Sequence, residues 1–232
     1  MFLMAMAGIC LAGTGSGQNV DSGSFGVFVD GKRVATEKFS IQQRGGGSVA
    51  TGEVRVGDAS SKPDQTSELQ LTSSGELKRY EWHEISPSQA DAVVTPNEPF
   101  LIEQLSTTPG KKPMQQPFMV PVTTMILDNN FFFQRQILAW RYMASGCKQV
   151  NGRTECRLAP AKYGVLIPQE LTSAQVTMAY SGKEKVNLHG SERELYRLNL
   201  STEGAEWALW LDDSYKLQRV VKTGENTEVV RD

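Results

Sequence analysis

The stretch TTMILDNNFFFQRQILAWRYMASG, residues 123–146, decides how the rest of the chain can be arranged. It lacks proline and carries glycine only at its end, so it is the one segment suited to a substantial helix. On a helical wheel its apolar side chains surround most of the circumference: Phe131, Phe133, Ile137, Leu138, Trp140 and Tyr142. Gln134 and Arg141 form a narrow polar face, and Asp128 or Asn129 is expected to cap the N-terminus. Such a helix requires burial on several sides, which the inside of a curved sheet provides.

Hairpins are expected on the N-terminal side of this helix. Residues 24–42 read as the first, turning at Asp30-Gly31, because apolar residues alternate on both sides of that dipeptide. After a further strand, residues 68–85 read as a second hairpin that turns at Ser74-Gly75. Residues 107–121 carry four prolines, which exclude a continuous helix or a central strand and predict a surface connector.

The C-terminal third returns to strands separated by turn signals. Four segments are expected, at residues 173–182, 193–204, 205–224 and 226–232, with Asp212-Asp213-Ser214 as a turn inside the third. Trp207, Leu209 and Leu211 share one face of this sheet, and Trp210 lies on the other. The predicted fold class is therefore mainly β, a β-rich α+β fold. A curved antiparallel sheet, a half-barrel, wraps around one main helix, and residues 18–232 form a single domain.

The N-terminal segment MFLMAMAGICLAGTGSG, residues 1–17, is predicted to be a signal peptide. Its apolar part is shorter than the roughly 20 residues that cross a bilayer, so no transmembrane span is expected. The usual positively charged leader is missing, and the alternative is an apolar first strand or helix of the mature fold. Lipidation of Cys10 ranks below simple removal, because Ile9 stands where lipoprotein signals have a small residue. The expected location is periplasmic or extracellular.

Two cysteines, Cys147 and Cys156, remain once the leader is removed. An isolated pair in an oxidising compartment usually forms a disulfide, and Asn151-Gly152 between them favours a tight reversal of the chain. The alternatives are a redox dithiol, which normally has two intervening residues, and a metal site, which needs further ligands. A structural disulfide is the prediction.

Composition and motifs point away from nucleic acid and from catalysis. A net charge of −2 and a pI of about 5.8 provide no field that would gather nucleic acid. The sequence has no nucleophile elbow and no phosphate-binding glycine loop. His83 and His189 are expected to face solvent on separate strands, and Asp212 with Asp213 is expected to form a turn rather than an acid–base pair. We therefore expect no enzyme activity, no cofactor and no metal.

The C-terminal segment WALWLDDSYKLQRVV, residues 207–221, carries a resemblance. With N-terminal hairpins and one apolar helix before it, it resembles the exported half-barrel proteins of bacterial envelopes. These include the lipoprotein-carrier (LolA/LolB-like) group and related uncharacterised secreted families. The resemblance implies a curved antiparallel sheet around helices, often with an apolar cavity for an acyl chain. This chain departs from that pattern by offering one clear helix instead of several.

Aromatic residues are the candidate ligand-binding residues: Trp82, Phe131, Phe133, Trp140, Trp207, Trp210 and Tyr215. The first hypothesis is an exported, non-catalytic protein that binds a lipid, an acyl group or an envelope component in the hollow between sheet and helix. In the alternative these residues are core, and the chain is a structural or protein-interaction module of the cell envelope. A third hypothesis, a hydrolase with an unrecognised site, requires His83 or His189 within hydrogen-bond reach of a serine or carboxylate in a cleft.

Overall fold

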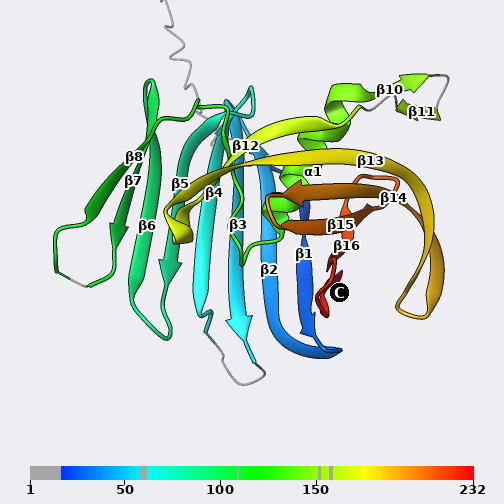
Figure 1. Cartoon of the computed structure of the whole chain (residues 1–232), viewed down its shortest axis with the longest axis horizontal. Coiled ribbons are helices and arrows are strands. Elements are labelled where there is room, and N and C mark those ends of the chain that lie inside the picture. The colour runs from blue at the N-terminus through cyan, green and yellow to red at the C-terminus, as the bar shows by residue number, and fades with distance from the viewer. Residues whose placement is uncertain (1–16, 58–61, 109, 151–152, 157–158) are drawn as a thin grey trace, which may run out of the picture.

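A computed structural model describes residues 17–57, 62–108, 110–150, 153–156 and 159–232 (Figure 1). The predicted signal peptide, apart from Gly17, lies outside these residues. No helix of the described residues has the length and hydropathy that crossing a membrane requires.

Fifteen strands of the described chain form one sheet, in the order β8-β7-β6-β5-β4-β3-β2-β1-β17-β16-β15-β14-β13-β12-β9. Their bounds are β1 (Gln18–Val29), β2 (Lys32–Arg44), β3 (Gly47–Val56), β4 (Gln65–Thr72), β5 (Leu77–Glu84), β6 (Ala90–Asn97), β7 (Phe100–Ser106), β8 (Met114–Phe118), β9 (Met125–Ile126), β12 (Ala161–Ile167), β13 (Thr172–Leu188), β14 (Ser191–Thr202), β15 (Ala205–Leu211), β16 (Leu217–Lys222) and β17 (Thr227–Arg231). The strands β10 (Cys147–Val150) and β11 (Arg153–Cys156) form a separate hairpin. Neighbouring strands of the large sheet are antiparallel except β9, which pairs in parallel with β12.

The predicted hairpins are present. Asp30 and Gly31, with φ of 50° and 74°, connect β1 to β2, because a two-residue hairpin turn of this kind needs positive φ at both positions. Gly75, with φ of 81°, lies in the turn between β4 and β5. β1 also pairs with the last strand, β17, so the two ends of the described chain meet inside the sheet. This pairing joins the N-terminal and C-terminal halves into one surface.

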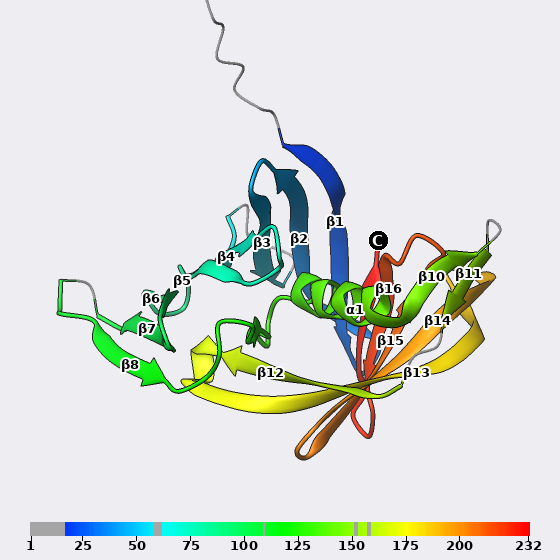
Figure 2. The same ribbon diagram turned by 90° about the horizontal axis from the view of Figure 1, so that it is seen from above.

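The sheet curves around the one α-helix of the described residues, α1 (Phe133–Gly146). Figure 2 shows α1 between the wall formed by β1 to β4 and the strands β12 to β14. The predicted fold class, a curved antiparallel sheet around one main helix, is confirmed. The sheet stays open, because β8 and β9 are its two edges.

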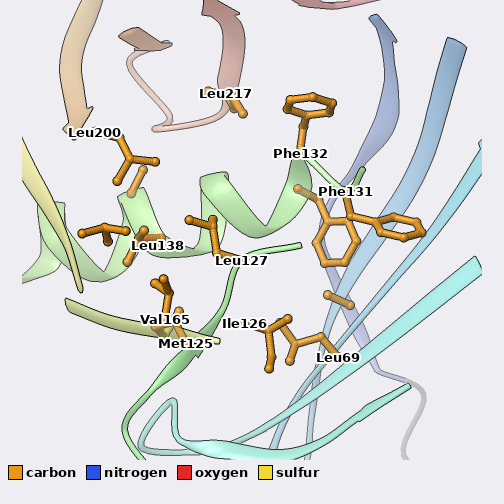
Figure 3. Packing of buried hydrophobic residues seen from close by; sticks show 14 of the residues in the cluster. Leu69, Met125, Ile126, Leu127, Phe131, Phe132, Leu138, Val165, Leu200 and Leu217 are labelled. Carbon is orange, nitrogen blue, oxygen red and sulfur yellow. The ribbon is translucent and has the colours of Figure 1, made fainter. Parts of the chain in front are cut away.

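The core lies between α1 and the inner face of the sheet (Figure 3). Phe131 and Phe133 are fully buried, and a β-carbon on Gly52 of β3 would lie 2.6 Å from the first ring and 2.7 Å from the second. Glycine at position 52 therefore creates the space into which the start of the helix packs. The segment Met125–Leu127 adds further buried side chains beneath α1.

Two details of the helix prediction are wrong, its N-terminal cap and the position of Gln134. The helix begins at Phe133, and neither Asp128 nor Asn129 is its cap. Glu37 of β2 supplies the acceptor instead, because its carboxylate accepts the backbone N–H groups of Phe132 and Phe133. Gln134 is not on a polar face but has 0% exposure, because its Oε1 accepts the backbone N–H of Asp128 inside the core.

Two further expectations, for residues 107–121 and for His189, are corrected by the strand positions. The proline-rich residues 107–121 include β8, an edge strand, which is the place in a sheet where proline is tolerated. His189 lies in the turn between β13 and β14, with φ of 50°, rather than on a strand.

A second apolar cluster lies on the outer face of the C-terminal strands: Val186, Leu188, Leu195, Ala208 and Trp210. A register shift between Tyr180 and Gly182 reverses the side to which later β13 side chains point. Val186 and Leu188 consequently meet Trp210, whereas Leu209 and Leu211 face the main core. The prediction that Trp210 lies on the opposite face of the sheet from Leu209 and Leu211 is confirmed.

Candidate functional site

The seven candidate aromatic residues occupy three different environments. The ones buried in the main core are Trp82, Phe131 and Phe133. Trp210 belongs to the outer cluster, where Arg197 and Arg219 lie over its ring, so it shares no hollow with the others. The remaining ones are half-buried at the margin of the main core: Trp140, Trp207 and Tyr215.

Four aromatic residues are joined by successive contacts that begin at α1, and we call them the aromatic row: Trp140, Tyr215, Tyr196 and Tyr180. Trp140 Nε1 donates to the backbone oxygen of Tyr215 at 2.6 Å. The rings of Tyr215 and Tyr196 have centroids 5.4 Å apart, and those of Tyr196 and Tyr180 are 6.2 Å apart. Trp140, Tyr180 and Tyr215 remain partly accessible, unlike the closed core aromatics. The row therefore offers apolar surface that the fold does not itself cover.

The turn after β15 holds one member of the row in place. Tyr215 has φ of 59°, a conformation that is uncommon for a bulky residue. The backbone N–H of Tyr215 donates to the backbone oxygen of Asp212 at 2.8 Å. The Asp212 carboxylate accepts the backbone N–H groups of Ser214 and Lys216. The prediction that Asp212 belongs to a turn is confirmed.

A cation lies over one ring of the aromatic row. Lys183 Nζ is 4.5 Å from the centroid of the Tyr196 ring and 2.9 Å from a carboxylate oxygen of Asp213. The hydrogen bond to Asp213 raises the pKa of Lys183. A ligand on the row would therefore meet aromatic rings with a charged pair beside Tyr196.

The aromatic row includes two residues that sequence analysis did not select, Tyr180 and Tyr196. Tyr196, at every second position with Leu198 and Leu200, lies on the same inner face of β14 as those two buried leucines. This period-two pattern was a usable sequence signal for placing Tyr196 on the inner face. Tyr180 comes just before the register shift in β13, where the face of a side chain cannot be read from alternation.

A buried charge cluster fixes the start of α1: Glu37, Asp128 and Arg135. The Glu37 carboxylate accepts the N–H of Phe132 at 2.7 Å and that of Phe133 at 3.2 Å. Arg135 Nη1 donates to the backbone oxygen of Asp128 at 3.0 Å. Its guanidinium carbon is 4.8 Å from the ring centroid of Phe132 and 4.9 Å from that of Trp207.

Burial shifts the protonation of this cluster. Burial raises the pKa of Glu37 to about 8, while the two backbone hydrogen bonds and Arg135 act in the opposite direction. Burial likewise raises the pKa of Asp128 to about 6 and lowers that of Arg135 to about 10. Because all three side chains are at most 3% exposed, the cluster positions the helix and meets no substrate.

Glu103 of β7 stands apart from that cluster because neither of its carboxylate oxygens has a hydrogen-bond partner among the described residues. The residue is 0% exposed, and burial raises its pKa to about 8, with the Asp128 carboxylate adding to the shift. Asp128 itself accepts the Tyr80 hydroxyl at 2.6 Å. A charged residue at an inward position of a strand was the sequence signal for Glu103, and no hypothesis used it.

Asp21 connects the first and last strands of the described chain, β1 and β17, to the helix. Its carboxylate accepts two hydrogen bonds from Arg231, at 2.9 and 2.8 Å, one from Gln136 at 2.8 Å, and an ion pair from Lys216 at 3.1 Å. Burial opposes ionisation, but the hydrogen bonds from Arg231, Gln136 and Lys216 hold the pKa of Asp21 below its usual value. Asp21 is therefore a fixed anion inside the fold.

The histidines meet the hydrolase hypothesis only in part. His83 Nδ1 lies 2.5 Å from Asp91 Oδ1, beside a hollow of about 360 Å³ lined by His83, Glu84, Ile85, Gln89 and Asp91. Its Nε2 lies 4.0 Å from Glu81 Oε2, and the hydroxyl of Ser88 donates to Glu84. The ring is thus flanked by carboxylates, and no nucleophile is positioned on it among the described residues.

The second histidine contacts a backbone oxygen and, among the described residues, no serine or carboxylate side chain within hydrogen-bond distance. His189 Nε2 lies 2.8 Å from the backbone oxygen of Arg231. Within the described ranges, no group of three or more histidine, cysteine, aspartate or glutamate residues is arranged to hold a metal ion. The absence of enzyme activity stays a prediction.

The cysteines lie on the β10–β11 hairpin. Its register sets Cys147 directly opposite Cys156, which is a pairing that brings β-carbons close together. The side chain of Cys156 and the turn Asn151-Gly152 lie outside the described residues. The disulfide remains a prediction, supported by the strand register.

Comparisons with known proteins identify the fold alone. No family model matches the chain, and no curated protein sequence matches it. The chain is similar in structure to a β-barrel-like protein of a domain of unknown function, DUF1849, from Brucella abortus. The TM-score is 0.54 at 10% sequence identity, and the match covers 90% of this chain and 93% of that one.

The β-barrel-like layout expected from the sequence is thus confirmed. The narrower resemblance to the lipoprotein-carrier group is not confirmed, because the similar structure is known only as a domain of unknown function. Residues 207–221, which carried the resemblance, form most of β15, the Asp212 turn and most of β16.

Proposed function

We propose that this chain is an exported, non-catalytic protein that binds an apolar ligand, a lipid or an acyl group, on the aromatic row. One observation carries the proposal: three residues of the row, Trp140, Tyr180 and Tyr215, are partly accessible, whereas Phe131 and Phe133 of the same core are fully buried. Accessible aromatic surface on the concave side of a β-barrel-like fold suits an apolar ligand. The opposed cysteines support export, because such pairs persist as disulfides outside the cytoplasm.

The experiment is a binding titration of the full chain with a fluorescent fatty acid, preceded by native mass spectrometry of protein purified from its expression host. We expect co-purified lipid and saturable binding. Trp140→Ala and Tyr215→Ala should each weaken binding at least about tenfold, because each removes a contact surface in the row. Trp210→Phe is the matched control, since Trp210 lies on the outer face, and it should leave binding unchanged. Absence of lipid and of saturable binding in the unaltered protein would refute the proposal.

A second candidate, a protein-interaction module of the cell envelope, is favoured by a different observation. Trp82, Phe131 and Phe133 fill the hollow as core, which leaves less room for a ligand than a lined cavity would. The edge strand β8 carries Met114 with 49% exposure, and Met119 just after it has 79%. A crosslinked envelope partner that contacts these methionines, found together with no lipid binding, would select this candidate.

A further inference from the structure

The register shift in β13 turns a lysine towards the inner face of the sheet. Tyr180 lies opposite Leu198 on that face, and the extra residue Ser181 then moves Lys183 into the next inner position. Lys183 is directly opposite Tyr196, which shares the inner face with Leu198. Its ammonium group lies 4.5 Å from the centroid of the Tyr196 ring. The fold therefore places a positive charge over the face of a ring in the aromatic row.

Charged side chains continue from this ring towards the turn of the β13–β14 hairpin. Lys183 Nζ lies 2.9 Å from an oxygen of Asp213 and 3.9 Å from an oxygen of Glu194. Lys185 Nζ lies 2.8 Å from an oxygen of Glu192. Two ammonium groups therefore meet three carboxylates, which leaves this group of side chains with one surplus negative charge.

The carboxylates are the accessible members of this group. The side chains of Asp213 and Glu194 are 78% and 61% exposed, whereas that of Lys183 is 33% exposed. An incoming ammonium group can pair with both carboxylates, and the face of the tyrosine ring attracts a positive charge as well. A carboxylate or phosphate head would instead add a further negative charge where negative charge is already in excess. The charges beside the aromatic row therefore favour a cationic head.

We propose that the ligand of the aromatic row carries a positively charged head group, an amine or a quaternary ammonium, which binds over the Tyr196 ring beside Asp213 and Glu194. In the unliganded chain the ammonium of Lys183 occupies this position. Its flexible stem lets it leave the ring when the ligand arrives. This inference rests on the proposed function, because it assigns the head of the same ligand whose apolar chain contacts the row.

Three amphiphiles that share a ten-carbon chain and differ in the head test the assignment: decyltrimethylammonium, decanoate and decanol. Each is titrated into the full chain below its critical micelle concentration, at pH 7.5 and low salt, and binding is followed by tryptophan fluorescence. We expect decyltrimethylammonium to bind about fivefold more tightly than decanoate, because exposed charge pairs and cation–π contacts each change affinity only a few-fold. Decanol should lie between them. Added salt should reduce the difference, since exposed charges are screened.

Charge variants locate the head group. Asp213→Asn should reduce the preference for decyltrimethylammonium over decanoate to less than about twofold, because it removes the surplus negative charge. Glu194→Gln should act in the same direction and serves if Asp213→Asn disturbs the turn. Lys183→Met keeps the apolar stem and removes the competing ammonium, so it should tighten binding of decyltrimethylammonium about threefold. Glu206→Gln is the matched control, because Glu206 is exposed on the outer face of β15, and it should leave all three affinities unchanged.

Two results on the unaltered chain would overturn the head-group assignment while the proposed function stands: equal affinity for decyltrimethylammonium and decanoate, or tighter binding of decanoate. Neither depends on the folding of a variant. An undiminished preference in both Asp213→Asn and Glu194→Gln would also overturn the position of the head beside Tyr196. Absence of saturable binding by all three amphiphiles would refute the proposed function and this inference together.

Discussion

Gln136 on α1 donates from Nε2 to the Asp21 carboxylate on β1 at 2.8 Å, while its Oε1 accepts the backbone N–H of Leu217 on β16 at 2.6 Å. One side-chain amide therefore connects α1 to β1 and to β16, the two strands that flank β17 in the sheet. The helix is fixed in the hollow by these polar contacts as well as by its apolar faces.

The first prediction concerns this amide. Gln136→Leu keeps the volume but leaves the buried Leu217 N–H without an acceptor, so we expect the free energy of unfolding to fall by about 2 kcal/mol. Urea unfolding followed by tryptophan fluorescence measures it. Gln104→Leu, at an exposed position of β7, is the control and should change stability by less than about 0.5 kcal/mol. An equal loss of stability in the two variants would show that the hydrogen bonds of Gln136 contribute nothing specific.

Asp21 makes stability fall in acid. Its pKa in the folded state lies below the ordinary value of 3.8, so its contribution is present above pH 3.8 and is lost as pH falls through the folded pKa. Asp21→Asn should lower stability at pH 7 and flatten the loss between pH 4 and pH 2, compared with the unaltered chain. Urea unfolding across this range checks it, and an unchanged acid slope in Asp21→Asn would contradict it.

Two buried glutamates should respond differently to the same substitution. Glu37 accepts two backbone N–H groups, and an amide offers only one acceptor oxygen, so Glu37→Gln should cost about 1–3 kcal/mol. Glu103 has no hydrogen bond to lose, so Glu103→Gln should be neutral or stabilising at pH 7. Chemical unfolding of both variants under one set of conditions measures the contrast. Equal destabilisation would mean that burial alone, rather than hydrogen bonding, sets both costs.

The outline of the fold was predictable because its signals are local. The Asp30-Gly31 turn, the proline content of residues 107–121 and the long apolar segment each constrain the backbone within a few residues. The start of the helix was not predictable, because its acceptor, Glu37, is 95 residues away from Phe132 along the chain. The aromatic row was only half predictable, since the register shift after Tyr180 changes which side chains share a face. Contacts between distant segments decided each of the errors.

Gly52 gives a prediction about core packing. A methyl group there would press on the rings of Phe131 and Phe133, so Gly52→Ala should destabilise by about 1–3 kcal/mol. Gly45→Ala is the control, because nothing lies within 4 Å of a β-carbon at that position. In a double-mutant cycle with Phe131→Leu, the smaller side chain should absorb part of the Gly52→Ala cost. Strict additivity of the two substitutions would show that position 52 does not contact the ring.

The cysteine pair gives a prediction that links the hairpin to export. Since β10 and β11 set Cys147 opposite Cys156, we expect a disulfide in protein recovered from an oxidising compartment. Alkylation before and after reduction, read by mass spectrometry, should show two protected thiols that become reactive on reduction. The double variant Cys147→Ser with Cys156→Ser should lose about 2–3 kcal/mol, the entropy model's value for a loop of about ten residues. Because that cost depends on the bond rather than on side-chain packing, the unaltered chain in reducing buffer should show the same loss. Full alkylation without reductant would place these thiols outside any disulfide and remove a main support for export.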